Sequence, residues 1–374
     1  MNVLELLSSP VWTGPAEPIA SVSRGLLDRG HYLEWGIDTR RTGDLGQHLR
    51  ELGFRVREDL RLCTKGGLMA IAADAARLRK LSAGFDVLHA NFSHDHFLCV
   101  LATRGQRARR HRILRTVHSA RSLRWRLLQR SLYQSTDGVI AVCEAHAQTI
   151  RQELGVPSER VATIPGAVDT HIFTPDGPSL RAELGIPDDI PVIGIVSRIK
   201  PGRRHLELLA AFDQVLKQLP LARLLIVGRG EGLADLQQRV ATLNLSGKAI
   251  FAGYRVGAEL AAAYRTMNVK VLLAEGNDGT CRALLEAMAA GRPGIAYRFG
   301  APAEAIVHNH SGLLIEPGDV SGLAAAAVQL LSEPHRALQM GQAARARMQV
   351  FYTHAGRTRA IERFFMAILR LPPA

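Results

Sequence analysis

The segment from Gly276 to Gly294, GNDGTCRALLEAMAAGRPG, places two carboxylates where they could act on one ligand. Glu286 interrupts an apolar helical run, and Asp278 lies eight residues earlier in a glycine-rich loop. Burying a carboxylate costs free energy unless it is paired or bound, so Glu286 needs a partner. A carboxylate accepts two hydrogen bonds at once, which suits the neighbouring hydroxyls of a sugar or a ribose.

The separation of the two acids argues against a glycoside hydrolase. The catalytic carboxylates of those enzymes lie about 5–10 Å apart, whereas eight helical residues span about 12 Å. The longer separation favours two acids that hold different parts of one long ligand, such as a nucleotide-sugar. The diphosphate of that ligand would lie at the free N–H groups where the helix opens, at Gly279, Thr280 and Cys281. A structural interpretation stays open, in which Asp278 caps the helix and Glu286 belongs to a structural network.

The hydrophobic pattern predicts an α/β scaffold in each half of the chain. Short β-like runs alternate with helical patterns, which is typical of a doubly wound parallel sheet covered on both faces. The predicted strands are Val3–Leu7, Val87–Ala90, Ile113–Val117, Gly138–Val142, Val161–Ile164, Val192–Val196, Arg223–Val227, Ala249–Phe251, Val269–Leu273, Gly294–Ala296 and Leu313–Ile315. Helices are predicted over Ile19–Arg29, Met69–Leu81, His205–Leu219 and His354–Leu371. Asp278 follows a predicted strand, and such domains bind ligands at the carboxyl ends of their strands.

The length of 374 residues predicts two domains. A Pro/Gly-rich stretch, Phe173–Ser179, is typical of a linker, so we expect domains over 1–173 and 174–352 and a terminal helix over 353–374 that crosses back to the first domain. The four cysteines form neither a zinc pattern nor a disulfide framework, which indicates a reducing cytoplasm. No apolar run reaches the roughly 18–20 residues of a membrane span, and the N-terminus has no basic region of a signal peptide.

The net charge of +13 indicates attraction to an anionic partner. Between Asp95 and Asp137 there is no acid but there are ten arginines, within the segment Arg104–Arg130. This segment predicts a surface for an anionic membrane, and Trp125, Leu128 and Leu132 form one stripe of a possible amphipathic helix there. Alternatively, the stripe faces the domain core and the arginines are simply solvated. Aromatic residues make up only 5% of the chain, which argues against a nucleic-acid-binding protein.

Several motifs in order along the chain resemble retaining glycosyltransferases of family 4. The strongest is DGTCRALLEAMAAGRPGIA, which is similar to the acid-x7-acid signature of that family. LLDRGH, FDVLHAN, DGVIAVCEAHA, VATIPGAVDTHIF, IVGRGEG and GLLIEPGDVSGLAAA follow the family order over essentially the whole chain. The resemblance implies the GT-B fold, two Rossmann-like domains that face a central cleft, with the acceptor site in the first and the nucleotide-sugar site in the second.

This sequence departs from the family pattern at a few positions. Asp278 stands where the family usually has glutamate, and Glu275 could fill that role in another alignment. Thr280 replaces a common aromatic residue. In VSRIKPGRRHLELL the family has arginine and then lysine five residues on, and here these are Arg198 and Arg203. The first loop has the single glycine Gly14 where two are common.

The resemblance implies the transfer of a sugar, with retention, from a nucleotide-diphosphate-sugar to a hydroxyl of a glycan or lipid-linked acceptor. It implies polysaccharide or lipopolysaccharide assembly in the cytoplasm and no cofactor or metal. The arginine-rich segment adds the expectation of peripheral association at the inner face of the membrane. The implied residues are His118, Arg198, Arg203 and Asp278 for catalysis, and Gly14, Gly279, Thr280, Cys281, Arg282 and Glu286 for the donor. Asn91, His94 and His96 follow another predicted strand of the first domain, which makes them candidates for the acceptor site, and a structural role for them stays open.

Two other enzyme classes stay as alternatives. A nucleotide-sugar 2-epimerase has the same architecture and donor site but needs no acceptor. A dinucleotide-binding oxidoreductase would rest on Gly228-Arg-Gly-Glu-Gly232, which lacks the Gly-x-Gly-x-x-Gly spacing.

Overall fold

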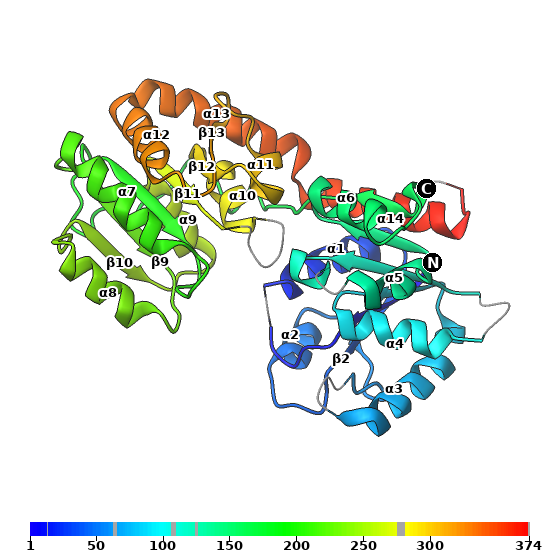
Figure 1. Cartoon of the computed structure of the whole chain (residues 1–374). Helices are drawn as coiled ribbons and strands as arrows, with labels where there is room; N and C mark the ends of the chain where they lie inside the picture. The colour runs from blue at the N-terminus through cyan, green and yellow to red at the C-terminus, as the bar shows by residue number, and fades with distance from the viewer. Residues whose placement is uncertain (13, 63–65, 106–109, 124–125, 275–280, 373–374) are drawn as a thin grey trace. The chain divides into compact units, whose positions relative to one another are not determined.

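The computed structural model describes the whole chain except residues 13, 63–65, 106–109, 124–125, 275–280 and 373–374. The described residues form two compact units (Figure 1). One unit holds Met1–Gly166 together with the last helix of the chain, and the other holds the described residues between Ala167 and Thr353.

The described residues of the first unit contain a seven-stranded parallel sheet in the order β3-β2-β1-β4-β5-β6-β7. Its strands are β1 (Asn2–Leu7), β2 (Tyr32–Ile37), β3 (Arg55–Val56), β4 (Val87–Ala90), β5 (Arg112–Val117), β6 (Gly138–Ala141) and β7 (Val161–Thr163). Its helices are α1 (Ala16–Asp28), α2 (Leu45–Glu51), α3 (Gly67–Leu81), α4 (Ser93–Thr103), α5 (Arg126–Gln134), α6 (Glu144–Gln152) and α14 (His354–Leu369). The strand order reverses between β1 and β4, so ligands are expected at their carboxyl ends.

The second unit repeats this architecture with six strands in the described residues, in the order β10-β9-β8-β11-β12-β13. Its strands are β8 (Val192–Val196), β9 (Arg223–Val227), β10 (Ala249–Gly253), β11 (Val269–Leu272), β12 (Gly294–Tyr297) and β13 (Gly312–Ile315). Its helices are α7 (His205–Gln218), α8 (Leu233–Thr242), α9 (Gly257–Thr266), α10 (Arg282–Ala289), α11 (Gly300–Ala305), α12 (Val320–Ser332) and α13 (Pro334–Phe351). The order reverses between β8 and β11.

Both faces of the first sheet are covered because side chains alternate along each strand. On β1, Val3 and Leu7 pack with residues of α1 and α14, whereas Leu4 and Leu6 pack with residues of α3 and α4. Glu5 lies between Val3 and Leu7 and is only 1% exposed. A carboxylate therefore lies on the same face of β1 as a large apolar core.

The last helix, α14, belongs to the first unit although it follows the second in sequence (Figure 1). It packs against α1, and Ile361 and Phe365 enter the same core as β1. Glu362 forms an ion pair of 2.6 Å with Arg29 and lies 2.6 Å from His31 Nε2, beyond the end of α1. These contacts anchor the helix through both apolar and charged groups.

Candidate functional site

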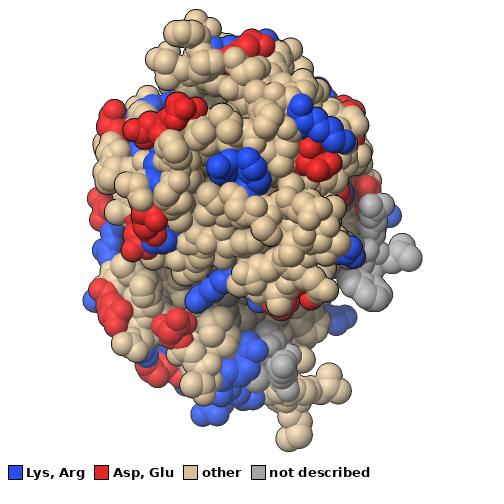
Figure 2. Space-filling model, turned by 90° about the vertical axis from the view of Figure 1, so that its left-hand side faces the viewer, with Lys and Arg blue, Asp and Glu red and all other residues tan. Residues whose placement is uncertain are grey.

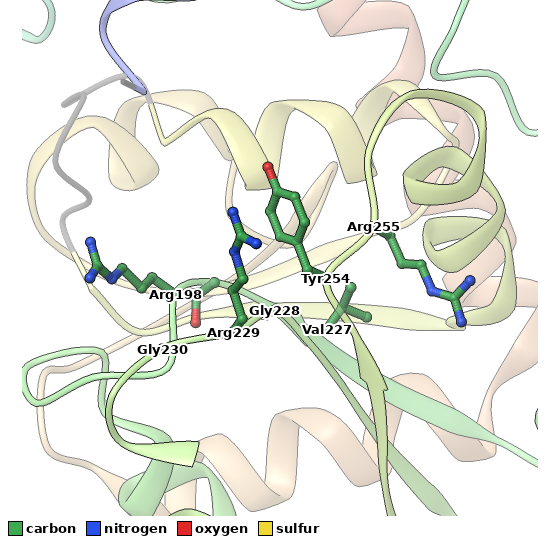
Figure 3. Close-up of a pocket in the computed structure, with 8 residues that line it drawn as sticks. Arg198, Val227, Gly228, Arg229, Gly230, Tyr254 and Arg255 are labelled. Atoms are coloured by element: carbon green, nitrogen blue, oxygen red, sulfur yellow. The ribbon is translucent and has the colours of Figure 1, made fainter. Parts of the chain in front are cut away.

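A cationic pocket opens at the carboxyl ends of three neighbouring strands of the second unit, β8, β9 and β10 (Figure 3). It has a volume of about 480 Å³ and is lined by Ser197, Arg198, Val227, Gly228, Arg229, Gly230, Tyr254 and Arg255. Three of these side chains are guanidinium groups, and the described lining includes no carboxylate. The pocket is therefore suited to an anion, and arginine binds phosphate through two parallel hydrogen bonds.

Glycines let two loops approach closely enough to form this pocket. A Cβ on Gly228 would lie 2.0 Å from the carbonyl oxygen of Ser197, and one on Gly230 would lie 2.1 Å from that of Ile199. Because neither glycine has a Cβ atom, the two backbones come close enough for the Ile199 N–H to donate a hydrogen bond to the Arg229 carbonyl at 3.0 Å. The loop after β8 is thereby joined to the loop after β9, which brings Arg198 and Arg229 to one place.

The arginines of the pocket differ in how they are held. Arg229 lies over the ring of Tyr254, with its guanidinium carbon 4.2 Å from the ring centre. In Figure 3 the two side chains lie next to each other and point in the same direction. Arg255 points to the other side of Tyr254 and pairs with Glu183. Arg198 is 63% exposed and lies 3.3 Å from Glu231, an ion pair that solvent weakens. Arg198 is therefore available to exchange Glu231 for a phosphate.

Glu286 lies in a buried polar cluster of the same unit. It is 4% exposed, and it accepts a hydrogen bond from the Tyr264 hydroxyl at 2.7 Å. The Arg282 guanidinium lies 3.0 Å from its other oxygen. Burial, and then the negative charge of Glu286, hold the pKa of Tyr264 well above its usual value, so this hydroxyl stays protonated and donates.

Lys270 interacts electrostatically with both Glu286 and His205. Lys270 is fully buried on β11, and burial lowers its pKa to about 7 against the opposing attraction of Glu286. His205 begins α7 and lies 3.0 Å from Ser197, which lines the pocket. Burial, and then the charges of Lys270 and Arg203, lower the pKa of His205 to about 4. His205 is therefore neutral at physiological pH, so it adds no positive charge next to Ser197 of the pocket.

A second polar cluster crosses the sheet of the first unit at the reversal of strand order. Glu5 on β1 lies 2.8 Å from His89 Nδ1 on β4, and His89 Nε2 lies 2.7 Å from the Thr116 hydroxyl on β5. The Asn91 amide also donates to Glu5, and the Asn91 oxygen lies 3.0 Å from His118 Nε2. The structure thus brings together Asn91 and His118, which follow different strands.

The other acceptor candidates lie apart from these bonds. His96 is 1% exposed, and its ring bonds to Thr136 at 2.6 Å and packs on Tyr133. Burial, and then Arg115, hold its pKa well below the usual value. Neither Asn91 nor His96 presents an exposed polar surface to an acceptor. His94 is half-buried, and among the described residues its Nε2 has no hydrogen-bond partner.

The structure describes some of the remaining predicted donor and catalytic residues but not others. Gly14 is exposed just before α1, and Arg203 is half-buried. Cys281 precedes α10 with a left-handed backbone, φ 44°, and is 4% exposed. Asp278, Gly279, Thr280 and the alternative acid Glu275 lie outside the described residues, as does Trp125 of the predicted stripe.

The arginine-rich segment Arg104–Arg130 is not uniformly a surface. Arg104, Arg110, Arg121 and Arg130 are exposed. Arg115 is 1% exposed and donates to the Ala90 carbonyl, because it lies on β5 inside the sheet, so it does not contribute to an anion-binding surface. On the side of the molecule shown in Figure 2, basic and acidic side chains are intermixed. Within the described part of the chain, no helix is long and apolar enough to cross a membrane, and no group of three or more metal-ligating side chains occurs.

Sequence reasoning missed several residues of these clusters. Glu5 and Lys270 each carry the signal that pointed to Glu286, a charge within an apolar run. His89, Tyr264 and His205 gave no such signal, because their roles depend on strand register and helix packing.

Comparison with known protein families shows which family the chain belongs to. A family model described as glycosyl transferases group 1 matches residues 176–347, and one described as glycosyltransferase family 4 matches residues 14–172. The chain belongs to glycosyltransferase family 4. It is a glycosyltransferase of the GT-B fold that uses a nucleotide-sugar donor, which confirms the predicted family, fold class and enzyme class.

Curated relatives of this glycosyltransferase act on different acceptors. The N-acetyl-alpha-D-glucosaminyl L-malate synthase of Bacillus anthracis is 29% identical over 287 residues, which cover 74% of this chain and 73% of that protein. The GDP-mannose-dependent alpha-(1-6)-phosphatidylinositol monomannoside mannosyltransferase of Mycobacterium tuberculosis is 29% identical over 284 residues, 72% of this chain and 73% of that protein.

Solved structures share the fold of this glycosyltransferase. The Anabaena protein HepE, crystallised with UDP and glucose, matches with a TM-score of 0.81 at 20% identity over 97% of this chain and 98% of that one. The lipopolysaccharide outer core galactosyltransferase WaaB matches with a TM-score of 0.79 at 14% identity over 98% of this chain and 99% of that one.

Proposed function

We propose that this glycosyltransferase moves a sugar from a nucleoside-diphosphate-sugar, with retention, to a hydroxyl of a glycan or lipid-linked acceptor during assembly of cell-envelope polysaccharide or lipopolysaccharide. The observation that carries the proposal is the pocket of Arg198, Arg229 and Arg255 at the carboxyl ends of β8–β10. Doubly wound domains bind nucleotides at such strand ends. Of these arginines, Arg198 and Arg229 are suited to a diphosphate, because arginine binds phosphate bidentately.

The chemistry follows from charge at the leaving group. As the bond between sugar and diphosphate breaks, negative charge grows on the phosphate oxygens, and fixed cations nearby lower the barrier. Arg198 and Arg203 supply that charge, together with the N-terminus of α10, which begins at Arg282. This charge replaces a divalent metal in the proposal, so addition of EDTA leaves the rate unchanged. Retention then comes from attack of the acceptor hydroxyl on the face that the diphosphate leaves, and the departing diphosphate takes up the proton of that hydroxyl.

The donor's other groups are assigned to the buried acids and to Tyr254. Glu286 holds the ribose hydroxyls, because Tyr264 and Arg282 fix its carboxylate and Arg282 can exchange one contact. Asp278, or Glu275 in its place, holds hydroxyls of the transferred sugar. Tyr254 is 55% exposed, so its ring offers a stacking surface to the base beside Arg229. Gly14, Thr280 and Cys281 complete the donor contacts.

The acceptor is assigned to the first unit. His118 contacts the transferred sugar. His94 Nε2, which has no hydrogen-bond partner among the described residues, accepts or donates a hydrogen bond at the acceptor. An anionic membrane surface meets the exposed arginines of 104–130, which gives the enzyme a peripheral location at the inner face of the membrane. Sedimentation with anionic and neutral vesicles at low salt tests this part, and equal binding to both would contradict it.

Thermal shift with UDP, GDP, ADP, CMP and NAD tests the core of the proposal. We expect one nucleoside diphosphate to stabilise the protein and its effect to fall in Arg198→Ala and Glu286→Ala. The sugar derivatives of that nucleotide are then screened for slow hydrolysis by water and for transfer. Failure of every nucleotide to bind at millimolar concentration would overturn the proposal.

A further inference from the structure

We propose that a groove between α7 and α8 is a second ligand site of this enzyme, and that it binds a small soluble sugar phosphate or polyol phosphate. The groove lies within the second unit and has a volume of about 880 Å³. It is lined by the loop after β8, the first turn of α7 and one side of α8. Small-molecule pockets usually measure about 300–1,000 Å³. The proposed sugar transfer uses the other pocket and does not depend on this groove.

The groove is separate from the cationic pocket described above, and in the described part of the chain the two share no lining residue. The backbone of Ile199 connects their walls. Its N–H donates to the Arg229 carbonyl at 3.0 Å, and its carbonyl accepts from the Gly232 N–H at 3.1 Å. Arg198 lines the pocket and Lys200 lines the groove, on either side of Ile199 in the sequence. A ligand in the groove therefore leaves the pocket open.

Two cations of the groove are not paired with carboxylates. Lys200 lies in the loop after β8 and Arg239 lies on α8, so they reach the groove from different elements. Among the described residues, neither side chain forms an ion pair within 4 Å. Ammonium and guanidinium groups both donate strong hydrogen bonds to phosphate oxygens. A phosphate group of the ligand is therefore expected at these two residues.

Arg204 is a third cation of the groove, and its side chain is held in place. Its backbone is left-handed, with φ 61°, a conformation that is uncommon outside glycine and costs free energy. The guanidinium lies 2.7 Å from Glu207 and over the ring of Tyr297, whose hydroxyl bonds to the other oxygen of Glu207. A guanidinium has five N–H groups, so Arg204 keeps donors for a ligand beside this bond. Backbone strain that its surroundings hold in place in this way is typical of ligand sites.

The other lining groups are suited to hydroxyls and to the carbon face of a ring. Asp235 and Gln238 are exposed on α8, where the carboxylate accepts hydrogen bonds and the amide both donates and accepts. Leu206 lines the groove and is 56% exposed, beside the buried Leu236. The lining holds three cations and two carboxylates, a small positive excess. This excess favours a ligand with one phosphate and several hydroxyls over a polyanion.

Calorimetric titration of the whole chain with glucose 6-phosphate and with myo-inositol 1-phosphate tests the site. We expect at least one of them to bind, and its affinity to fall at least about tenfold in Lys200→Met and in Arg239→Gln, because a charge-assisted hydrogen bond is lost. Lys217→Met is the matched control, since Lys217 lies in the last turn of the same helix α7 and is 71% exposed. That variant should bind as the wild type does, and so should Arg198→Ala, which alters only the first pocket.

Hydrogen exchange locates the ligand without a variant, because slower exchange is expected over residues 199–207 and 232–242 in its presence. Urea denaturation checks that the variants keep the stability of the wild type, as expected for surface side chains. Failure of both phosphates to bind would overturn the proposal, as would equal binding of unphosphorylated glucose. A loss of affinity in Lys217→Met as large as in Lys200→Met would identify net charge as the cause. Loss in Arg198→Ala with normal binding in Lys200→Met would place the ligand in the first pocket and refute the second site.

Discussion

The hydroxyl of Tyr264 lies 2.7 Å from Glu286 Oε2 and joins α9 to α10 inside the second unit. Tyr264 is fully buried and Glu286 nearly so, so the bond is shielded from water. A hydrogen bond to a charged group under these conditions contributes more than an average one. The relationship fixes the direction of the carboxylate that we assign to the ribose.

Tyr264→Phe removes this hydroxyl and keeps the ring. We expect the free energy of unfolding to fall by about 1–3 kcal/mol, because a buried carboxylate oxygen loses its donor. The thermal shift produced by the bound nucleotide should also decrease. Urea denaturation measures the first effect and a nucleotide titration the second.

Tyr297→Phe is the matched control, since the Tyr297 hydroxyl bonds to another acid, Glu207, at 2.5 Å. Tyr297→Phe should lower the free energy of unfolding but leave nucleotide affinity close to wild type. Equal loss of affinity in both variants would indicate a general loosening of the unit and not a role of Glu286.

Arg198→Ala should weaken binding of a nucleoside diphosphate by about 10–100-fold, because charge-assisted hydrogen bonds contribute about 1.5–3 kcal/mol each. Its stability should stay within about 0.5 kcal/mol of wild type, because the side chain is exposed and its ion pair with Glu231 is weak. Calorimetric titration measures the affinity. Arg223→Ala, at the opposite end of β9, should bind the nucleotide normally, and a similar loss there would point to net charge as the cause.

Gly230→Ala should disrupt the pocket by separating its two loops. The new Cβ would lie 2.1 Å from the Ile199 carbonyl oxygen, so the backbone must move. We expect a loss of stability of about 1–3 kcal/mol and weakened nucleotide binding. In Gly232→Ala the nearest atom is 3.5 Å away, an ordinary contact, and both properties should be nearly unchanged. Normal binding in Gly230→Ala would show that the close approach of these loops does not shape the site.

His205 should make stability fall as the pH is lowered from 6.5 to 4. Its folded-state pKa is about 4, below the ordinary 6.5, so the unfolded chain takes up a proton first as the pH falls. The loss amounts to at most about 3 kcal/mol and is complete below pH 4. Urea denaturation at several pH values should show this dependence weakened in His205→Gln and retained in His171→Gln, which alters an exposed histidine. Parallel curves for the wild type and His205→Gln would contradict it.

Most strands and both doubly wound units could be predicted, because a buried parallel strand has a short run of apolar residues in the sequence. The strand β2 (Tyr32–Ile37) was missed because Glu34 and Gly36 interrupt its pattern. The structure shows that Glu34 is satisfied by Tyr32 and Arg57, which lie beside it. The apolar pattern alone does not report such pairings.

The candidate site was predictable where a single residue differs in chemistry from its neighbours in the sequence, as a charged residue does in an apolar run. Glu286 did so, and the structure gives it Tyr264 and Arg282 as partners. The row Glu5, His89 and Thr116 depends on the register of three strands, which places Glu5 opposite His89. Arg229 and Tyr254 meet only because two loops end at one edge of the sheet.

The position of α14 has a consequence for biosynthesis. Ile361 and Phe365 complete the core of the first unit, and Phe365 packs edge-on against His89 at 5.1 Å between ring centres. A ribosome must therefore make the whole second unit before the first can close, a delay on the order of ten seconds or more. During that time the nascent first unit lacks part of the cover on one face of its sheet, where α1 is already present and α14 is not. Truncation of the last helix, or a premature stop before it, should leave a chain that depends on chaperones or aggregates, even though every residue of the proposed donor site is present.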